Sequence, residues 1–141
     1  MSVNCDKFIG YSIDILEEWS KLDSSIQEKW SKDIKQENKE EFDKAGFTPY
    51  YSEQSSLKDT VTILYDGMSG QYCKLVYVID YEAYAEEENN ENIVNTINNL
   101  LLHSPVPFSI KKNIKKIYKS IFNKDLNKTS DIKPEYIIHW H

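Results

Sequence analysis

The stretch TVTILYDGMSGQYCKLVYVID, residues 60–80, restricts the fold of this chain more than any other part of it. It consists of two runs rich in β-branched and aromatic residues, joined by a polar segment that contains Asp66, Gly67 and Gly70. Two such runs on either side of an aspartate–glycine turn strongly indicate a β-hairpin. The second run, LVYVI, is apolar on both faces, which predicts a strand that is covered on both sides. The chain should therefore fold around an antiparallel sheet.

The segments on either side of the hairpin predict the remaining elements from their apolar spacing, capping residues and turn residues. Strands are expected at residues 7–14 and 135–141, with a short edge strand at 49–52, and helices at residues 15–22, 25–45, 93–103 and 108–122. The order is then β-α-α-β-β-α-α-β. We predict a single α+β domain over residues 1–141, with helices packed mainly on one face of the sheet. The sheet should be antiparallel, with four to five strands and a central β-hairpin.

Every positively charged side chain outside the histidines is a lysine, because the 17 basic residues include no arginine. Arginine provides the rigid, bidentate group that recognises phosphates, carboxylates and guanine edges. A sequence-specific DNA reader, a nucleotide hydrolase and most nucleases are therefore poor candidates. The chain also has no HExxH or CxxC motif, and we expect no cofactor.

The net charge of −6 is unevenly distributed along the chain. Residues 1–105 carry 9 lysines and 20 acidic residues, whereas residues 106–141 carry 8 lysines and 3 acidic residues. The first part therefore has a net charge of −11 and the second part a net charge of +5. Such a separation is typical of proteins that attract a charged partner or associate with themselves.

The leading hypothesis is a non-enzymatic binding protein whose acidic surface recognises a basic protein partner. Carboxylates on the expected helix 25–45 and in the acidic segment that follows the hairpin would attract the partner, and tyrosines would anchor it. The candidate residues are Glu28, Asp33, Glu37, Glu40, Glu41, Tyr50, Tyr51, Tyr84, Glu86, Glu87, Glu88 and Glu91. No residue is assigned a catalytic role.

In its general profile the chain resembles toxin-immunity proteins and phage-encoded inhibitors of bacterial defence, such as anti-CRISPR proteins. The shared features are small size, acidic composition and the absence of catalytic motifs. The resemblance implies an inhibitor or immunity factor that acts on a nuclease or on a nucleic-acid-binding defence complex. The oligomeric state is left open.

A first alternative is a nucleic-acid-binding protein that uses the expected helix 108–122. Its lysines could contact a phosphate backbone, and such binding would weaken steeply with salt. They are Lys111, Lys112, Lys115, Lys116 and Lys119. Tyr118 and Phe122 have the spacing of core residues rather than of stacking residues.

A second alternative is a small hydrolase that depends on a metal or on a cysteine–histidine pair. His139 and His141 lie two residues apart and would point to the same face of a strand, and His103, Cys5 or Cys73 could add a ligand. We expect no metal site, because a histidine pair alone is a weak signal. The expected arrangement has Ile138 and Trp140 packed inward and the histidines half exposed.

The cellular location is inferred from the cysteines and from the start of the sequence. Two cysteines far apart, Cys5 and Cys73, are typical of free thiols in a reducing compartment. The first residues do not have the pattern of a signal peptide, and no apolar stretch is long enough to span a bilayer. We expect a cytoplasmic protein of a bacterial or phage-infected cell, with no membrane contact.

Overall fold

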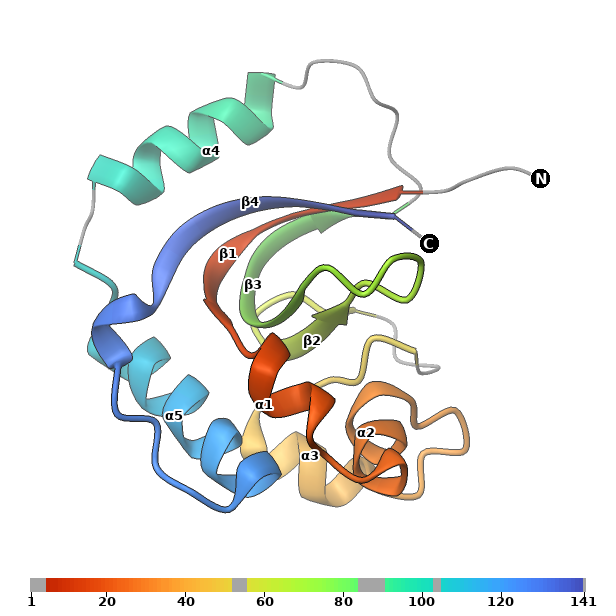
Figure 1. Ribbon diagram of the computed structural model, residues 1–141. Helices are drawn as coiled ribbons and strands as arrows, with labels where there is room; N and C mark the ends of the chain where they lie inside the picture. The colour runs from red at the N-terminus through yellow and green to blue at the C-terminus, as the bar shows by residue number, and fades with distance from the viewer. Residues whose placement is uncertain (1–4, 52–55, 84–90, 103–104, 141) are drawn as a thin grey trace.

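The computed structural model, shown in Figure 1, describes residues 5–51, 56–83, 91–102 and 105–140. It confirms an α+β fold with a four-stranded antiparallel sheet. The strands are β1 (Cys5–Asp14), β2 (Val61–Tyr65), β3 (Cys73–Glu82) and β4 (Lys133–Trp140). The helices are α1 (Leu16–Ser20), α2 (Ser24–Ser31), α3 (Lys39–Ala45), α4 (Glu91–Leu102) and α5 (Phe108–Phe122), with a 3-10 turn η1 (Thr129–Asp131) before β4.

The strands are ordered β2-β3-β1-β4 in the sheet, and all neighbouring pairs are antiparallel. The predicted hairpin is present as β2 and β3, with β3 inside the sheet and β2 at one edge. Asp66 stabilises the turn between these two strands, because its carboxylate accepts hydrogen bonds from the N–H groups of Met68, Ser69 and Gln71. This explains why an aspartate begins the turn.

The first strand passes through the middle of the sheet and is buried along almost its whole length. Its pairing with β3 is irregular between Ile9 and Gly10, where β3 contributes one extra residue. Gly10 is required at this place, because a Cβ atom there would collide with the carbonyl oxygen of Tyr77. The strands bend strongly, as Figure 1 shows, so the sheet has a convex and a concave face.

The main hydrophobic core lies on the convex face, between the sheet and the helices. It joins Ile13, Ile63 and Leu75 of the sheet to Ile114 and Ile117 of α5 and to the aromatic residues of α1, α2 and α3. Trp30 of α2 and Phe42 of α3 form an aromatic cluster with Phe47, which follows α3. The ring centroids are 4.8 Å apart for Trp30–Phe42, 5.0 Å for Trp30–Phe47 and 5.1 Å for Phe42–Phe47. Each such pair contributes about 0.5–1.5 kcal/mol beyond its buried area. The helices therefore cover one face, as the sequence predicts.

A second, smaller core fills the concave face. Phe8, Leu64, Val76, Val78 and Ile137 of the sheet meet Leu57 from the segment before β2. The rings of Tyr50, Tyr72 and Tyr81 pack against this group. Because both faces of the sheet are covered, β1 and β3 have buried side chains on both sides rather than at alternate positions only.

The single helix expected over residues 25–45 is wrong, because the chain forms two helices, α2 and α3, with an irregular link between them. In this link Gln36 has a positive φ of 56°, and Lys32 forms a bridge to Tyr51. Asp33 is buried and its carboxylate accepts the N–H groups of Glu37 and Asn38, both at 3.1 Å. These local bonds outweigh the helical spacing, since an aspartate that caps backbone groups competes with helix formation.

The ends of three helices have identifiable caps. Gly46 ends α3 in the left-handed conformation, with φ of 73°. The cap of α2 is Asp23, whose carboxylate accepts the N–H of Ser25. The cap position of α1 is Ile15, although Asp14 still accepts the N–H of Leu16 at 3.1 Å.

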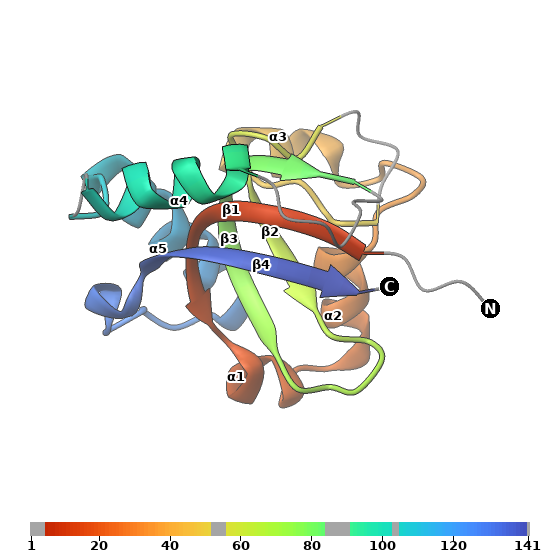
Figure 2. The ribbon, with the colours of Figure 1, turned by 90° about the horizontal axis from the view of Figure 1, so that it is seen from above.

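The last strand differs from the expected arrangement of its side chains. Ile137 and His139 are buried, with 6% and 1% exposure, whereas Ile138 is 40% exposed. The expectation that Ile138 packs inward and His139 is half exposed is therefore wrong. The strand pairs with β1 and forms the second edge of the sheet, next to α4 (Figure 2). Within the described ranges, no helix is long and apolar enough to cross a membrane.

Candidate functional site

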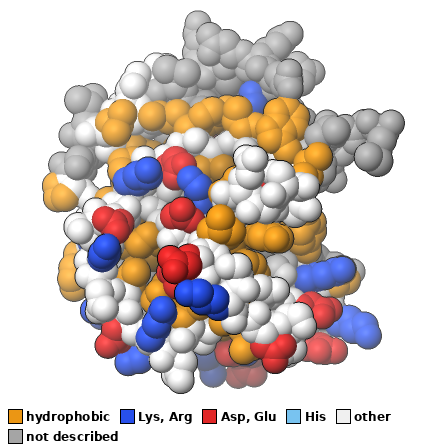
Figure 3. All heavy atoms as spheres, in the orientation of Figure 1, with side chains coloured by type: hydrophobic (Ala, Val, Ile, Leu, Met, Phe, Trp, Pro, Cys, Tyr) orange, Lys and Arg blue, Asp and Glu red, His pale blue; other side chains and the backbone are white. Residues whose placement is uncertain are grey.

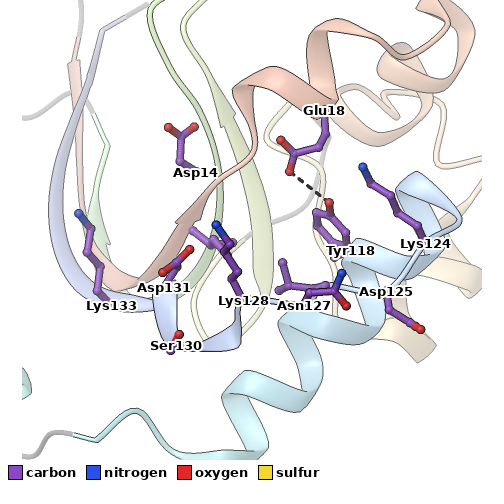
Figure 4. A pocket seen from close by; sticks show the side chains of 12 residues that line it. Asp14, Glu18, Tyr118, Lys124, Asp125, Asn127, Lys128, Ser130, Asp131 and Lys133 are labelled. Atoms are coloured by element: carbon purple, nitrogen blue, oxygen red, sulfur yellow. Dashed lines mark hydrogen bonds between the residues drawn. The ribbon is translucent and has the colours of Figure 1, made fainter.

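A hollow of about 700 Å³ lies where the end of β1, α1, α5 and the segment before β4 meet. Figure 4 shows Glu18 and Tyr118 on one side of it and Asp131, Lys128 and Lys133 on the other. The Tyr118 hydroxyl donates a hydrogen bond to Glu18 Oε2 at 3.1 Å. Burial of the phenol, together with the nearby Glu18 charge, raises the pKa of Tyr118 to about 12.

The charges around this hollow largely cancel. The hollow is lined by the acidic residues Asp14, Glu18 and Asp131 and by the cations Lys124, Lys128 and Lys133. Asp125 also lines the hollow and forms an ion pair with Lys119 at 3.4 Å. A near-neutral, open surface of this kind suits contact with a polar protein surface rather than tight binding of one ion. Sequence reasoning missed this site, because its residues come from four separate segments and form no motif.

The acidic residues predicted on residues 25–45 are only partly brought together. Glu37, Glu40 and Glu41 are exposed and line a shallow hollow of about 470 Å³, together with Asn38 and Lys44. Glu28 is exposed on α2. Asp33 does not belong to this surface, because it is buried and holds the link between α2 and α3.

Lysines neutralise part of the acidic surface. Glu40 pairs with Lys44 at 3.3 Å, and Glu41 pairs with Lys29 at 3.0 Å. Exposed pairs of this kind contribute little to stability, and a charged partner can displace them. On the face drawn in Figure 3, acidic and basic side chains are interspersed rather than separated. The acidic and basic parts of the sequence therefore do not form separate acidic and basic regions on this face.

The predicted tyrosine anchors have different surroundings. Tyr50 is half-buried on the concave face, where its hydroxyl donates to Asp6 and its ring contacts His139 at 4.9 Å between centroids. Tyr51 is 47% exposed and remains a candidate for contact with a partner. Tyr84, Glu86, Glu87 and Glu88 lie outside the described residues. Glu91 is the first residue of α4, and the structure does not describe its side chain.

The basic helix α5 has the amphipathic form that the sequence predicts. Ile114, Ile117 and Tyr118 are buried. Lys112, Lys115, Lys116 and Lys119 are exposed, and Lys111 is half-buried. Of these five lysines, Lys119 forms an ion pair, with Asp125, within the described part of the chain. At the start of the helix, Phe108 is 79% exposed and lies off the apolar stripe of the helix.

The histidine–cysteine alternative is not supported by the positions of its residues. Cys73 is fully buried among the convex core residues, and burial raises the pKa of its thiol. His139 lies on the concave face, where Nδ1 is 2.6 Å from the Tyr72 hydroxyl. Cys5 is buried too, whereas His103 and His141 lie outside the described residues. Among the described side chains, no group of three or more His, Cys, Asp or Glu could hold a metal ion.

A half-buried ionic network crosses the concave face near one end of the sheet. Glu135 of β4 accepts hydrogen bonds from Ser12 of β1 and from Lys74 of β3. Burial alone would raise the pKa of Glu135, but the bonds from Lys74 and Ser12 outweigh it, so the pKa is lowered. The network joins three strands and needs no ligand to explain it. We therefore assign it a structural role.

A scan against protein-family models finds no match for this chain. The searches of curated proteins and of solved structures likewise return no significant match.

Proposed function

We propose that the protein is a non-enzymatic binding protein whose acidic surface on α2 and α3 engages a basic protein partner. The observation that carries this proposal is that Glu37, Glu40 and Glu41 surround one hollow on the surface. Three carboxylates beside a shallow hollow suit an inserted lysine or arginine side chain of a partner, which would replace Lys44 as the cation there. Glu28 and the half-exposed Tyr51 would extend the contact.

The partner class follows from the chemistry of such a surface. Proteins that bind nucleic acids expose lysines and arginines, and an acidic protein can occupy that surface in place of the phosphates. We therefore propose an inhibitor or immunity factor that acts on a nuclease or on a nucleic-acid-binding defence complex. It would act in the cytoplasm of a bacterial or phage-infected cell, as an immunity protein or an anti-CRISPR-like inhibitor.

The test compares two variants that change the net charge equally. Glu40 and Glu17 are both highly exposed, at 87% and 80%, and each forms an ion pair with the lysine four residues later. A partner is first captured from bacterial lysate with the wild-type protein and purified. Its association rate is then measured at two salt concentrations. We expect Glu40→Lys to slow association roughly severalfold at low salt, and Glu17→Lys to have little effect.

The proposal fails if Glu40→Lys and Glu17→Lys have the same effect, because net charge alone would then explain the binding. It also fails if the captured protein presents an acidic surface. Thermal unfolding of both variants serves as the control for folding. Since both residues are exposed, we expect stability changes within about 0.5 kcal/mol of the wild type.

A second candidate function is nucleic-acid binding by α5. The observation in its favour is that Phe108, which is 79% exposed, begins the same helix that presents Lys112, Lys115 and Lys116 to solvent. An exposed aromatic ring beside lysines can stack on a base while the lysines contact phosphates. Binding of single-stranded RNA and DNA at two salt concentrations tests it. Affinity that does not change with salt, or no binding at all, excludes this function.

A further inference from the structure

We propose that the free edge of β4 pairs with the same strand of a second copy of this chain, which makes one continuous antiparallel sheet across a two-fold axis. This inference goes beyond the proposed function and does not depend on it. It rests on the direction of backbone groups in β4, on the apolar side chains beside them, and on the fit of the strand to itself.

The pairing of β1 determines which backbone groups of β4 face outward. The N–H of Ile15 donates to the carbonyl of Cys73 at 2.8 Å, so odd-numbered residues at this end of β1 face β3. Even-numbered residues of β1 therefore face β4 and pair with its odd-numbered residues, as Phe8 does with Ile137. It follows that Tyr136, Ile138 and Trp140 direct their backbone groups away from the sheet.

One of these outward groups already has a partner. The N–H of Trp140 forms a hydrogen bond with the hydroxyl of Tyr72, beside His139. For Tyr136 and Ile138, no backbone hydrogen bond on the outer side is formed with any described residue. Pro134 has no N–H group, which is typical of a position that faces outward from an edge strand. The open part of the edge is thus the segment 134–138.

Apolar side chains lie next to this open edge. Ile138 is 40% exposed, and Tyr136 and Trp140 are half-buried on the same side of the strand. On the neighbouring helix α4, Leu101 is 58% exposed. Figure 3 shows a band of hydrophobic side chains in the region where Figure 1 places β4 and α4. Edge strands of stable monomers are usually protected by charges, and the outward residues of this one are mainly apolar.

The residues of β4 also fit those of β4 in a second copy when the two strands are antiparallel. With the two-fold axis at Ile137, Tyr136 of each copy lies opposite Ile138 of the other. Both residues of each such pair would exchange their backbone hydrogen bonds, and their side chains would form an aromatic–β-branched pair. The paired segment would end on each side where Pro134, which lacks an N–H, comes opposite Trp140, whose N–H is already bound to Tyr72. Between these two ends the register leaves no outward backbone donor unpaired, and for that reason we favour a second copy over a peptide of another protein.

The experiment measures the oligomeric state of the full chain by sedimentation equilibrium over a range of concentrations. The variant Ile138→Lys places a charge on the exposed edge, and Ile138→Pro removes an N–H that the single copy does not use. The matched control is Ile34→Lys, which changes an isoleucine of 49% exposure in the link between α2 and α3. We expect the wild type and Ile34→Lys to dimerise equally. Both Ile138 variants should dimerise at least about tenfold more weakly.

Amide hydrogen exchange gives a second readout that a general loss of stability would not mimic. The Tyr136 and Ile138 amides should become protected as the wild-type concentration rises, whereas amides inside the sheet should not change with concentration. The proposal is overturned if the wild type is monomeric at its highest soluble concentration. It is also overturned if the Ile138 variants, shown to be folded by circular dichroism, dimerise as the wild type does. Binding of an unrelated extended peptide at these amides in a monomeric wild type would identify the other occupant and equally reject self-pairing.

Discussion

A single hydroxyl group, that of Tyr72, satisfies the polar groups at the end of the last strand. It accepts the N–H of Trp140 and lies 2.6 Å from Nδ1 of His139, which is 1% exposed. Burial of this phenol raises the pKa of Tyr72 to about 12, so it remains a neutral donor over the whole physiological range. The buried ring of His139 therefore has a hydrogen-bond partner inside the protein, and we assign the residue a structural role.

Removing this hydroxyl should be costly. In Tyr72→Phe, the ring of the buried His139 loses its partner at Nδ1, and an unsatisfied buried group costs about 1–3 kcal/mol. We expect a loss of this size in the free energy of unfolding, measured by urea denaturation. Tyr65→Phe is the control, because Tyr65 is 42% exposed. Equal effects of the two substitutions would contradict the role given to Tyr72.

Gly10 offers a second test of a single residue. In Gly10→Ala, the new methyl group would collide with the backbone oxygen of Tyr77, and backbone atoms inside a sheet cannot move aside easily. Overpacking of this kind costs about 1–3 kcal/mol. Gly67→Ala is the matched control, because nothing lies within 4 Å of a Cβ atom at that position. A thermal unfolding series should show a large loss for the first variant and almost none for the second.

At the scale of elements, the turn between β2 and β3 depends on one carboxylate. Hydrogen bonds from the Ser69 hydroxyl and from the N–H groups of Gln71, Ser69 and Met68 lower the pKa of Asp66 from 3.8 to about 2. Because the folded pKa lies below the unfolded one, ionised Asp66 stabilises the hairpin above pH 3.8. That stabilisation is lost as the pH falls through about 2.

The variant Asp66→Asn should therefore change how stability depends on pH. We expect its free energy of unfolding to fall less steeply than that of the wild type between pH 3.8 and about 2. Urea denaturation at a series of pH values measures both slopes. Asp80→Asn, which removes a carboxylate near the other end of β3, controls for the loss of charge. A slope of Asp66→Asn equal to that of the wild type would show that the turn bonds do not lower the pKa.

The elements also show which structures can be derived from sequence. The hairpin, α5 and the stop at Gly46 were predictable, because turn residues, apolar spacing and a left-handed glycine each act locally. The break between α2 and α3 was not predictable, because the link pairs through Lys32 with Tyr51, a residue distant in the sequence, and contains the buried Asp33. The inward side of β4 was also missed, since a buried histidine requires partners that come from distant segments.

The candidate site was less predictable than the fold. Sequence reasoning identified Glu37, Glu40 and Glu41 as a surface, and the chain does bring them around one hollow. It also selected Asp33 and Tyr50, whose polar groups are used inside the protein. Composition indicates that carboxylates are abundant but not which of them cap a backbone. The exposed Phe108 and the outward edge of β4 follow from packing alone.

At the scale of the whole molecule, the last strand connects the two cores. Ile137 belongs to the concave core, and the convex core includes Ile132, just before the strand. Removing the last five residues, 137–141, would delete Ile137 and His139 and expose the partner edge of β1. We expect this truncated chain to lose cooperative unfolding, as judged by thermal circular dichroism. The control is removal of His141 alone; a cooperative transition in the five-residue truncation would contradict the role of β4.

The pairing of β1 with β4 has a consequence for the speed of folding. Cys5 lies opposite Trp140, so the contacts of this strand pair join residues separated by nearly the whole length of the chain. Chains rich in such distant contacts fold slowly, because the entropy of closing a long loop is lost before the contact stabilises anything. The helices and the β2–β3 hairpin can form early from nearby residues. The pairing of β1 with β4 is therefore expected to form late in folding and to slow the folding of the whole chain.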